Sequence, residues 1–170
     1  PPWIEAPETI LFHHGVAIDS GIWASWSPAL SDRYRIVTFD VRGYGRSSIP
    51  DENFDWSFEQ LARDVLAVTD AAGVDKFHFV GESMGGAMGL HLAIHHPNRL
   101  LSVTPCTCPH KGGAVQWLAE WRDYIAEHGM DSWSKRMMGR RFYPGGLSEN
   151  AESWFANTQA SSAPRSVLGH

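Results

Sequence analysis

The sequence lacks the features of a cross-linked, secreted or membrane-spanning protein. Its two cysteines, Cys106 and Cys108, are one residue apart and too close in an extended strand to bridge easily, which excludes a disulfide scaffold. Reduced thiols indicate a cytoplasmic protein. No run of about 18 uncharged apolar residues occurs, and the first residues show no basic head followed by an apolar stretch. We therefore expect no membrane partner and no secretion signal at this start.

Positive charge is also scarce. The 170 residues carry a formal net charge of −5, and no stretch concentrates lysine or arginine, so a nucleic acid is not an expected partner. The composition, 43% hydrophobic and 12% aromatic, supplies enough apolar surface for a globular core. The composition leaves the oligomeric state open.

What the sequence does contain is an alternation of strand and helix patterns over residues 8–105. Short apolar runs bounded by turn residues predict strands at 9–12, 34–39, 77–80 and 100–104. Helices are predicted at 23–31, from a capping box at Ser57 to a stop at Gly73, and at 84–96. Such alternation predicts an α/β fold, with parallel strands, right-handed crossovers and helices on both faces.

Beyond Pro109 the pattern changes. Tryptophan and phenylalanine recur among helical stretches broken by glycine, and no buried-strand run interrupts them. We predict that residues 1–109 form the N-terminal part of an α/β core and that 110–170 form a helical cap, incomplete in this chain. The aromatic residues are interpreted as a packed face of that cap.

The chemistry is predicted to centre on Ser83. Gly81-Glu82-Ser83-Met84-Gly85 matches the pattern G-x-S-x-G and lies between a predicted strand and a predicted helix. A serine on so sharp a turn requires small neighbours, which Gly81, Gly85 and Gly86 provide. The alternative is an ordinary turn in which the serine only caps the helix.

Two backbone amides are predicted to stabilise an oxyanion beside Ser83. The Met84 N–H lies at the start of the predicted helix, where free amides and the positive end of the dipole meet. The second donor should come from the loop after the first strand, and the Val16 N–H is the candidate. His13 and His14 are expected to shape this loop, without a direct role in proton transfer.

Other polar residues are given structural interpretations. Asp40 and Arg42, in a glycine-rich segment, are expected to support the floor of the site, although Arg42 could meet a substrate carboxylate. Cys106 and Cys108 lack the spacing of a zinc site and are interpreted as buried thiols. We expect no metal and no cofactor.

Taken in order, these motifs resemble the α/β-hydrolase superfamily over about residues 8–108. The resemblance is carried by three segments: His14-Gly15, Asp40-Val41-Arg42-Gly43-Tyr44-Gly45-Arg46-Ser47 and Gly81-Glu82-Ser83-Met84-Gly85-Gly86. The tail, with Trp117, Arg122, Gly129-Met130 and Arg141-Phe142, is similar to the cap of 3-oxoadipate enol-lactonases and related carboxylic-ester hydrolases.

The resemblance implies hydrolysis of a carboxylic ester or lactone through an acyl-enzyme on Ser83, so the expected partner is a small-molecule substrate. A serine at this position excludes the epoxide hydrolases and haloalkane dehalogenases of similar fold, which need a carboxylate nucleophile. C–C bond hydrolases, cofactor-free haloperoxidases and non-catalytic ligand-binding members of the fold remain alternatives.

The remaining triad members are expected to lie outside this chain. In this fold the acid and the histidine follow the nucleophile on later strand ends, and no further strand pattern appears once the predicted cap begins at residue 110. No acid or base is assigned, so we expect the 170-residue polypeptide alone not to turn over esters. A sheet without its later strands is also expected to expose a hydrophobic edge that favours aggregation.

Overall fold

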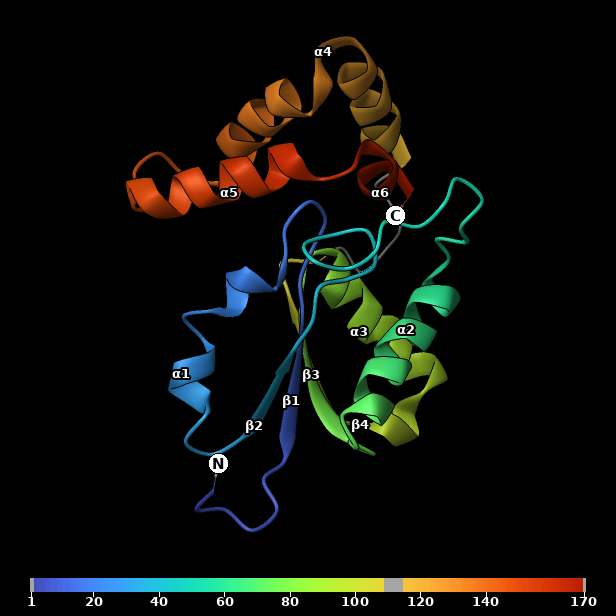
Figure 1. The fold of residues 1–170 in the computed structure, drawn as a ribbon, viewed down its shortest axis with the longest axis vertical. Helices are drawn as coiled ribbons and strands as arrows, with labels where there is room; N and C mark the ends of the chain where they lie inside the picture. The colour runs from blue at the N-terminus through green and yellow to red at the C-terminus, as the bar shows by residue number, and fades with distance from the viewer. Residues whose placement is uncertain (1, 109–114, 170) are drawn as a thin grey trace.

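A parallel sheet with helices on both faces carries three further helices above it (Figure 1). The computed structural model describes residues 2–108 and 115–169. The four strands stand in the order β2-β1-β3-β4 and all neighbours are parallel. Their bounds are β1 Thr9–His13, β2 Arg35–Thr38, β3 Phe77–Glu82 and β4 Leu100–Cys106. The predicted α/β class and all four predicted strands are confirmed, and β3 continues two residues further than predicted.

The central strand β1 is buried along its whole length, as its continuous apolar run predicts. Its side chains alternate between the faces: Ile10 and Phe12 belong to a cluster with Trp23, whereas Leu11 belongs to a cluster with Phe79. The similar apolar run at 34–39 predicts a second strand buried in the same way, and this prediction was wrong. Strand β2 is only partly covered, because it lies at an edge of the four-stranded sheet and has one neighbour.

Helices α2 and α3 cover one face, and α1 lies on the other (Figure 1). The helices and 3₁₀ turns up to β4 are η1 Ser20–Trp23, α1 Ser27–Leu30, α2 Phe58–Ala71, α3 Met84–His95 and η2 Pro97–Arg99. The predicted helix at 23–31 is therefore two short pieces, with Pro28 in the first turn of the second one. The helix start at Ser57 is confirmed, since its hydroxyl accepts a hydrogen bond from the Gln60 N–H. The reciprocal half of the capping box is not formed, because the Ser57 N–H donates to the Asp55 carboxylate at 2.9 Å.

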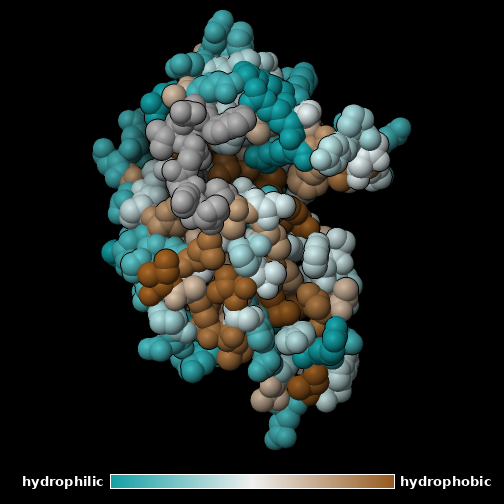
Figure 2. All heavy atoms as spheres, turned by 180° about the vertical axis from the view of Figure 1, so that it is seen from behind, coloured by the Kyte–Doolittle hydropathy of each residue, from teal (hydrophilic) through white to brown (hydrophobic). Residues whose placement is uncertain are grey.

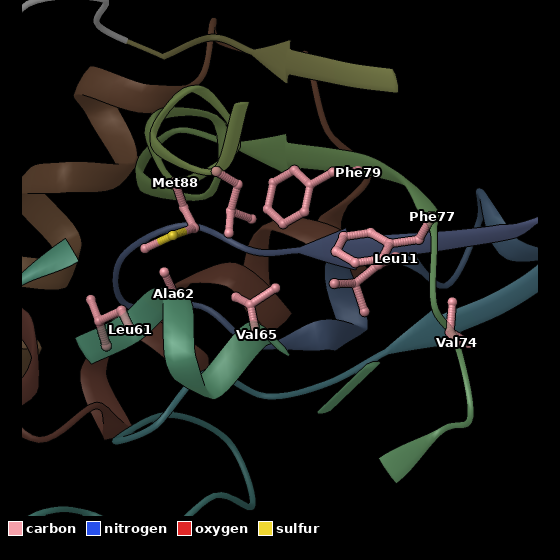
Figure 3. Close-up of a cluster of buried hydrophobic side chains, with 9 residues drawn as sticks. Leu11, Leu61, Ala62, Val65, Val74, Phe77, Phe79 and Met88 are labelled. Atoms are coloured by element: carbon pink, nitrogen blue, oxygen red, sulfur yellow. The ribbon is translucent and has the colours of Figure 1, made fainter. Parts of the chain in front are cut away.

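The main core lies between α2, α3 and the sheet. Figure 3 shows Val65 and Ala62 of α2 and Met88 of α3 directed toward Leu11 and Phe79 of the sheet. All five side chains are 3% exposed or less. Burying a leucine or phenylalanine contributes about 1.5–3 kcal/mol, so this cluster fixes the strand-to-helix layer that presents residue 83.

The opposite edge of the sheet is open. Strand β4 is exposed or half-buried at every position, and Leu101 on it and Ile94 near it are 42% and 72% exposed. Seen from behind, the lower body of the molecule carries a broad hydrophobic surface (Figure 2). The exposed apolar edge that the sequence predicts is therefore present in this chain.

The last part of the described chain is helical: α4 Val115–Arg141, α5 Glu149–Ser161 and α6 Pro164–Gly169. Helix α4 is kinked at Gly129, where φ is 76°, as the glycine-broken pattern predicts. These three helices lie above the carboxyl ends of the strands (Figure 1). Trp133, Met137 and Val167 pack there against Ala17 and Met84 of the strand-to-helix part. No helix in residues 2–108 and 115–169 is long and apolar enough to span a membrane.

Candidate active site

Ser83 occupies a strained turn between β3 and α3. Its φ is 54° and its ψ −116°, a region that non-glycine residues rarely adopt. Its backbone N–H still donates to the Cys106 carbonyl at 2.9 Å, and its carbonyl accepts from the Ala87 N–H at 3.1 Å. The backbone of Ser83 thus makes the last hydrogen bond to β4 and the first hydrogen bond of α3. Its hydroxyl makes no capping hydrogen bond, which argues against the helix-cap alternative.

The glycines around the serine are needed because backbone passes directly beside them. A Cβ on Gly81 would collide with the Gly85 carbonyl, and one on Gly85 would meet the carbonyl and ring of His13. A Cβ on Gly86 would lie 2.6 Å from the Cβ of Cys108. The prediction that these glycines make room for the turn is therefore confirmed.

The loop after β1 lies against the serine. A Cβ added to Gly15 would be 3.0 Å from the Ser83 Cβ. Val16, the next residue, packs on the cluster that contains Met84, the first residue of α3. The structure therefore brings together the three residues that the sequence singles out, although their roles in catalysis belong to the proposal below.

His13 and His14 are buried and hold backbone in place. His14 Nε2 accepts a hydrogen bond from the Val41 N–H at 2.8 Å, so its Nδ1 donates to the Gly15 carbonyl at 2.8 Å. His13 Nδ1 donates to the His14 carbonyl at 2.8 Å. Burial lowers the pKa of His14, which fits a neutral imidazole with one hydrogen bond at each ring nitrogen. Their contacts support a role in shaping the loop.

Asp40 and Arg42 have structural partners. Asp40 accepts hydrogen bonds from the Ser20 and Arg46 N–H groups, each at 2.9 Å. Burial raises the pKa of Asp40, but these hydrogen bonds outweigh it and the pKa falls below its usual value. Arg42 pairs with Asp64 through two bonds of 2.6 and 2.7 Å. These contacts support the structural interpretation of both residues.

Two charged residues that contact the loop after β1 have no role assigned in the sequence analysis, which names them only within its motifs. Glu82 immediately precedes Ser83, and burial raises the pKa of its carboxyl group, against the lowering effects of the Arg141 charge and of a hydrogen bond from the Gly15 backbone. Arg141, the last residue of α4, donates to the Val16 carbonyl at 3.2 Å. A charged residue at the end of a buried strand could have flagged Glu82. Arg141 belongs to the segment that carries the cap resemblance, but no local signal predicts its contact with Val16, which spans 125 positions.

A base for the serine is not found among the described side chains. Within residues 2–108 and 118–169, no hydrogen bond joins the Ser83 hydroxyl to a histidine or a carboxylate. His128, in the helical part of the chain, is 42% exposed and lies beside Glu127. His110 and His170 lie outside the described residues. The structure therefore adds no acid or base to the expectation from the sequence.

Among the described residues, neither the two thiols nor a group of potential metal ligands forms a second site. Cys106 and Cys108 are free and half-buried, so the prediction of buried thiols holds only in part. Burial raises the pKa of the Cys106 thiol, with smaller contributions from Glu82 and Cys108. No group of three or more potential metal ligands occurs among the described residues.

Comparison with known proteins finds both a lactone hydrolase and a carbamate hydrolase among the relatives of this chain. The 3-oxoadipate enol-lactonase 1 of Acinetobacter baylyi is 38% identical over 104 residues, which cover 59% of this chain and 38% of that protein. A Caulobacter segnis protein with the name "Putative carbamate hydrolase RutD" is 40% identical over 93 residues, 55% of this chain and 35% of the relative. The matched segments thus cover little more than a third of the length of these relatives.

A solved structure agrees over nearly the whole chain. The crystal structure of the enol-lactonase from Burkholderia xenovorans LB400 matches with a TM-score of 0.89, covering 96% of this chain and 63% of that one. At 23% identity this likeness speaks for the fold alone. Residues 8–167 match the sequence pattern of the family described as alpha/beta hydrolase fold. On this evidence the chain belongs to the α/β-hydrolase fold family.

Proposed function

We propose that the protein is a hydrolase that cleaves a carboxylic ester or lactone through an acyl-enzyme on Ser83. The observation that carries the proposal is the backbone of Ser83, held at a φ of 54° between β3 and α3 with its hydroxyl unused as a cap. Such strain in a residue persists only where the surrounding structure imposes it, and it clusters at functional sites. The family and the name of the Acinetobacter relative support a lactone or ester as substrate.

In this mechanism the Ser83 oxygen attacks the substrate carbonyl and gives its proton to a base, which passes it to the leaving alcohol. The oxyanion is held by the Val16 and Met84 N–H groups. The position of Met84 at the start of the twelve-residue helix α3 supports its part. Each donor is typically worth about 3–4 kcal/mol in the transition state. Water then attacks the acyl-enzyme and releases the acid and the serine.

The acid and the base are assigned to no residue of this chain, and we propose that the complete gene product supplies both after residue 170. The parts of the chain divide in the same proposal: 1–109 carry the nucleophile and the oxyanion donors, and 110–170 form a cap that lines the substrate pocket. The free thiols of Cys106 and Cys108 support a cytoplasmic location.

A carbamate is a second candidate substrate, which the name of the Caulobacter relative favours. Carbamate cleavage would use the same attack of Ser83 on a carbonyl carbon, with an amine or alcohol as leaving group. C–C bond hydrolysis, perhydrolysis of the haloperoxidase kind and ligand binding without catalysis stay as predictions from the resemblance. A panel of substrates separates these possibilities.

The test compares the complete gene product with its Ser83→Ala variant on p-nitrophenyl acetate, simple lactones and carbamates. We expect hydrolysis of at least one ester or lactone, and a loss of about a thousandfold or more in kcat without Ser83. The matched control is Ser31→Ala, which removes an exposed hydroxyl at the end of α1 and should leave the rate unchanged. Equal rates for Ser83→Ala and wild type would contradict the proposal.

A further inference from the structure

The loop between Gly15 and Val16 is held by charged side chains from two distant parts of the chain. At Gly15, the Glu82 carboxylate lies so close that an added Cβ would collide with its Oε2. The Gly15 backbone donates a hydrogen bond to this carboxylate. At Val16, the Arg141 guanidinium donates to the carbonyl at 3.2 Å. The loop is thus bonded on both sides of the peptide that joins its two residues.

The direction of the Val16 N–H depends on this peptide. In a trans peptide the N–H of one residue points away from the carbonyl of the residue before it. His14 Nδ1 holds the Gly15 carbonyl at 2.8 Å, which fixes one end of the plane. Rotation of the plane also requires movement of its neighbours, which Glu82 and Arg141 restrain. Three side chains therefore oppose rotation of the Val16 N–H.

Glu82 and Arg141 attract each other across the loop. Each charge stabilises the other, since Glu82 raises the pKa of Arg141 and Arg141 lowers that of Glu82, although burial acts in the opposite direction on both. These two described side chains form no direct ion pair within 4.0 Å. The attraction therefore acts over a longer distance than a direct ion pair, in surroundings where burial weakens screening by solvent.

We propose that Glu82 and Arg141 are positioning residues that clamp the Gly15–Val16 peptide, so that docking of α4 sets the direction of the Val16 N–H. The inference rests on the proposed function, in which that N–H is an oxyanion donor. Neither residue touches the reacting atoms. The clamp makes the end of α4 part of the catalytic device, because loss of its last side chain releases one side of the loop.

The kinetic test uses Arg141→Met and Arg141→Lys in the complete gene product, with a neutral ester as substrate. We expect Arg141→Met to lower kcat about tenfold with KM nearly unchanged, a fraction of the 10²–10³ that full loss of a donor costs. Arg141→Lys, which keeps a charge and a donor, should recover most of the rate. The matched control is Arg140→Met, one residue earlier, whose side chain is directed to the exposed Glu120.

A second arm tests the partner. Glu82→Gln keeps an acceptor for the Gly15 N–H and removes the charge, whereas Glu82→Ala removes both. The clamp predicts that Glu82→Ala loses about as much kcat as Arg141→Met and that Glu82→Gln loses less. A loss that appears in KM, and only for esters carrying an acidic group, would make Arg141 an anchor for the substrate anion and would overturn the positioning role.

A readout without turnover separates this inference from the proposed function. Amide hydrogen exchange is measured on peptides that cover residues 14–18 and 84–88 in wild type, Arg141→Met and Arg140→Met. The clamp predicts roughly tenfold faster exchange at 14–18 in Arg141→Met only, with 84–88 unchanged. This result stands even if wild type shows no Ser83-dependent hydrolysis, in which case only the proposed function fails. Unchanged exchange at 14–18, or equal acceleration in both segments, would overturn the clamp.

Discussion

The two sides of the proposed oxyanion site are built in different ways. On the Met84 side the position of the amide follows from backbone packing within a few residues: glycines at 81, 85 and 86 leave space, and α3 begins immediately after the serine. On the Val16 side the loop is held by His14, Glu82 and Arg141, whose partners come from separate segments. The first side is local and steric, and the second is long-range and electrostatic.

This difference predicts how each side fails. Steric exclusion by backbone allows no partial adjustment, because a colliding Cβ must displace main chain. A hydrogen-bonded loop loses its restraints one at a time, so single changes should have graded effects. Variants of the two sides should therefore separate by size, with the turn the more sensitive of the two.

The largest effect is expected for Gly85→Ala, on the steric side. Its new Cβ would meet the carbonyl and ring of His13, the latter at 2.6 Å, at a cost of about 3 kcal/mol in the free energy of unfolding. We expect kcat to fall by about a hundredfold or more, since the turn that presents Ser83 must shift. Thermal unfolding and ester hydrolysis measure the two losses.

Gly139→Ala is the matched control, because an added Cβ at this helical position meets nothing within 4 Å. It should leave the rate unchanged and stabilise α4 by about 0.5–1 kcal/mol. If both glycine variants behaved alike, close packing at Gly85 would not explain the turn.

A smaller loss is expected for His14→Phe, on the loop side. The phenyl ring fills similar space but leaves the Val41 N–H and the Gly15 carbonyl without their imidazole partner. An unsatisfied buried group costs about 1–3 kcal/mol, and kcat should fall about tenfold because the loop is loosened. The exposed His95→Phe serves as control. A loss as large as that of Gly85→Ala would remove the distinction between the two sides.

The next effect is a pH dependence of stability that arises at His14. Burial lowers the pKa of His14 below its usual 6.5, so in acid the unfolded chain takes up a proton that the folded chain does not. The contribution is complete above pH 6.5 and declines as the pH falls toward the folded pKa. The slope for one proton is at most about 1.4 kcal/mol per pH unit.

Burial lowers the pKa of His91 as well, so wild type alone does not isolate this contribution. Denaturant titrations between pH 7.5 and 5.5 should show a shallower decline for His14→Phe than for wild type, whereas His91→Gln should leave the His14 part intact. Parallel curves for wild type and His14→Phe would show that the imidazole is not held neutral.

The smallest effect is expected for Arg42→Ala, a change that lies on neither side of the proposed oxyanion site. Its pair with Asp64 is geometrically good, but the arginine side chain is 36% exposed, and solvent screening limits such pairs to about 1 kcal/mol. We expect chemical denaturation to show a loss of about 1 kcal/mol or less in the free energy of unfolding. Kinetic assays should show no change in kcat or in KM, including the KM for acidic esters. A rise in KM confined to acidic esters would instead make Arg42 a substrate contact.

The sequence predicts the steric side well and the electrostatic side poorly, for physical reasons. The run of glycines around Ser83 reports its own packing, since a residue without a Cβ is needed where backbones meet. The buried run of β1 and the capping box at Ser57 are likewise local patterns. Arg141 reaches Val16 only after the chain has folded back over 125 positions, and nothing in its own neighbourhood indicates that contact.

Strand β2, at an edge of the sheet, is a second feature that its own residues do not predict. The composition of residues 35–38 resembles that of a buried strand, yet β2 is only partly covered, because burial depends on what lies beside a strand and not on its own residues.

The central claim, that Ser83 is a nucleophile, is tested most directly by mass spectrometry of the complete gene product after treatment with a fluorophosphonate. The account predicts one adduct per chain, mapped to Ser83, and none in Ser83→Ala. Labelling should slow in Gly85→Ala and persist in Gly139→Ala. An adduct on another residue, or equal labelling of wild type and Ser83→Ala, would contradict the account.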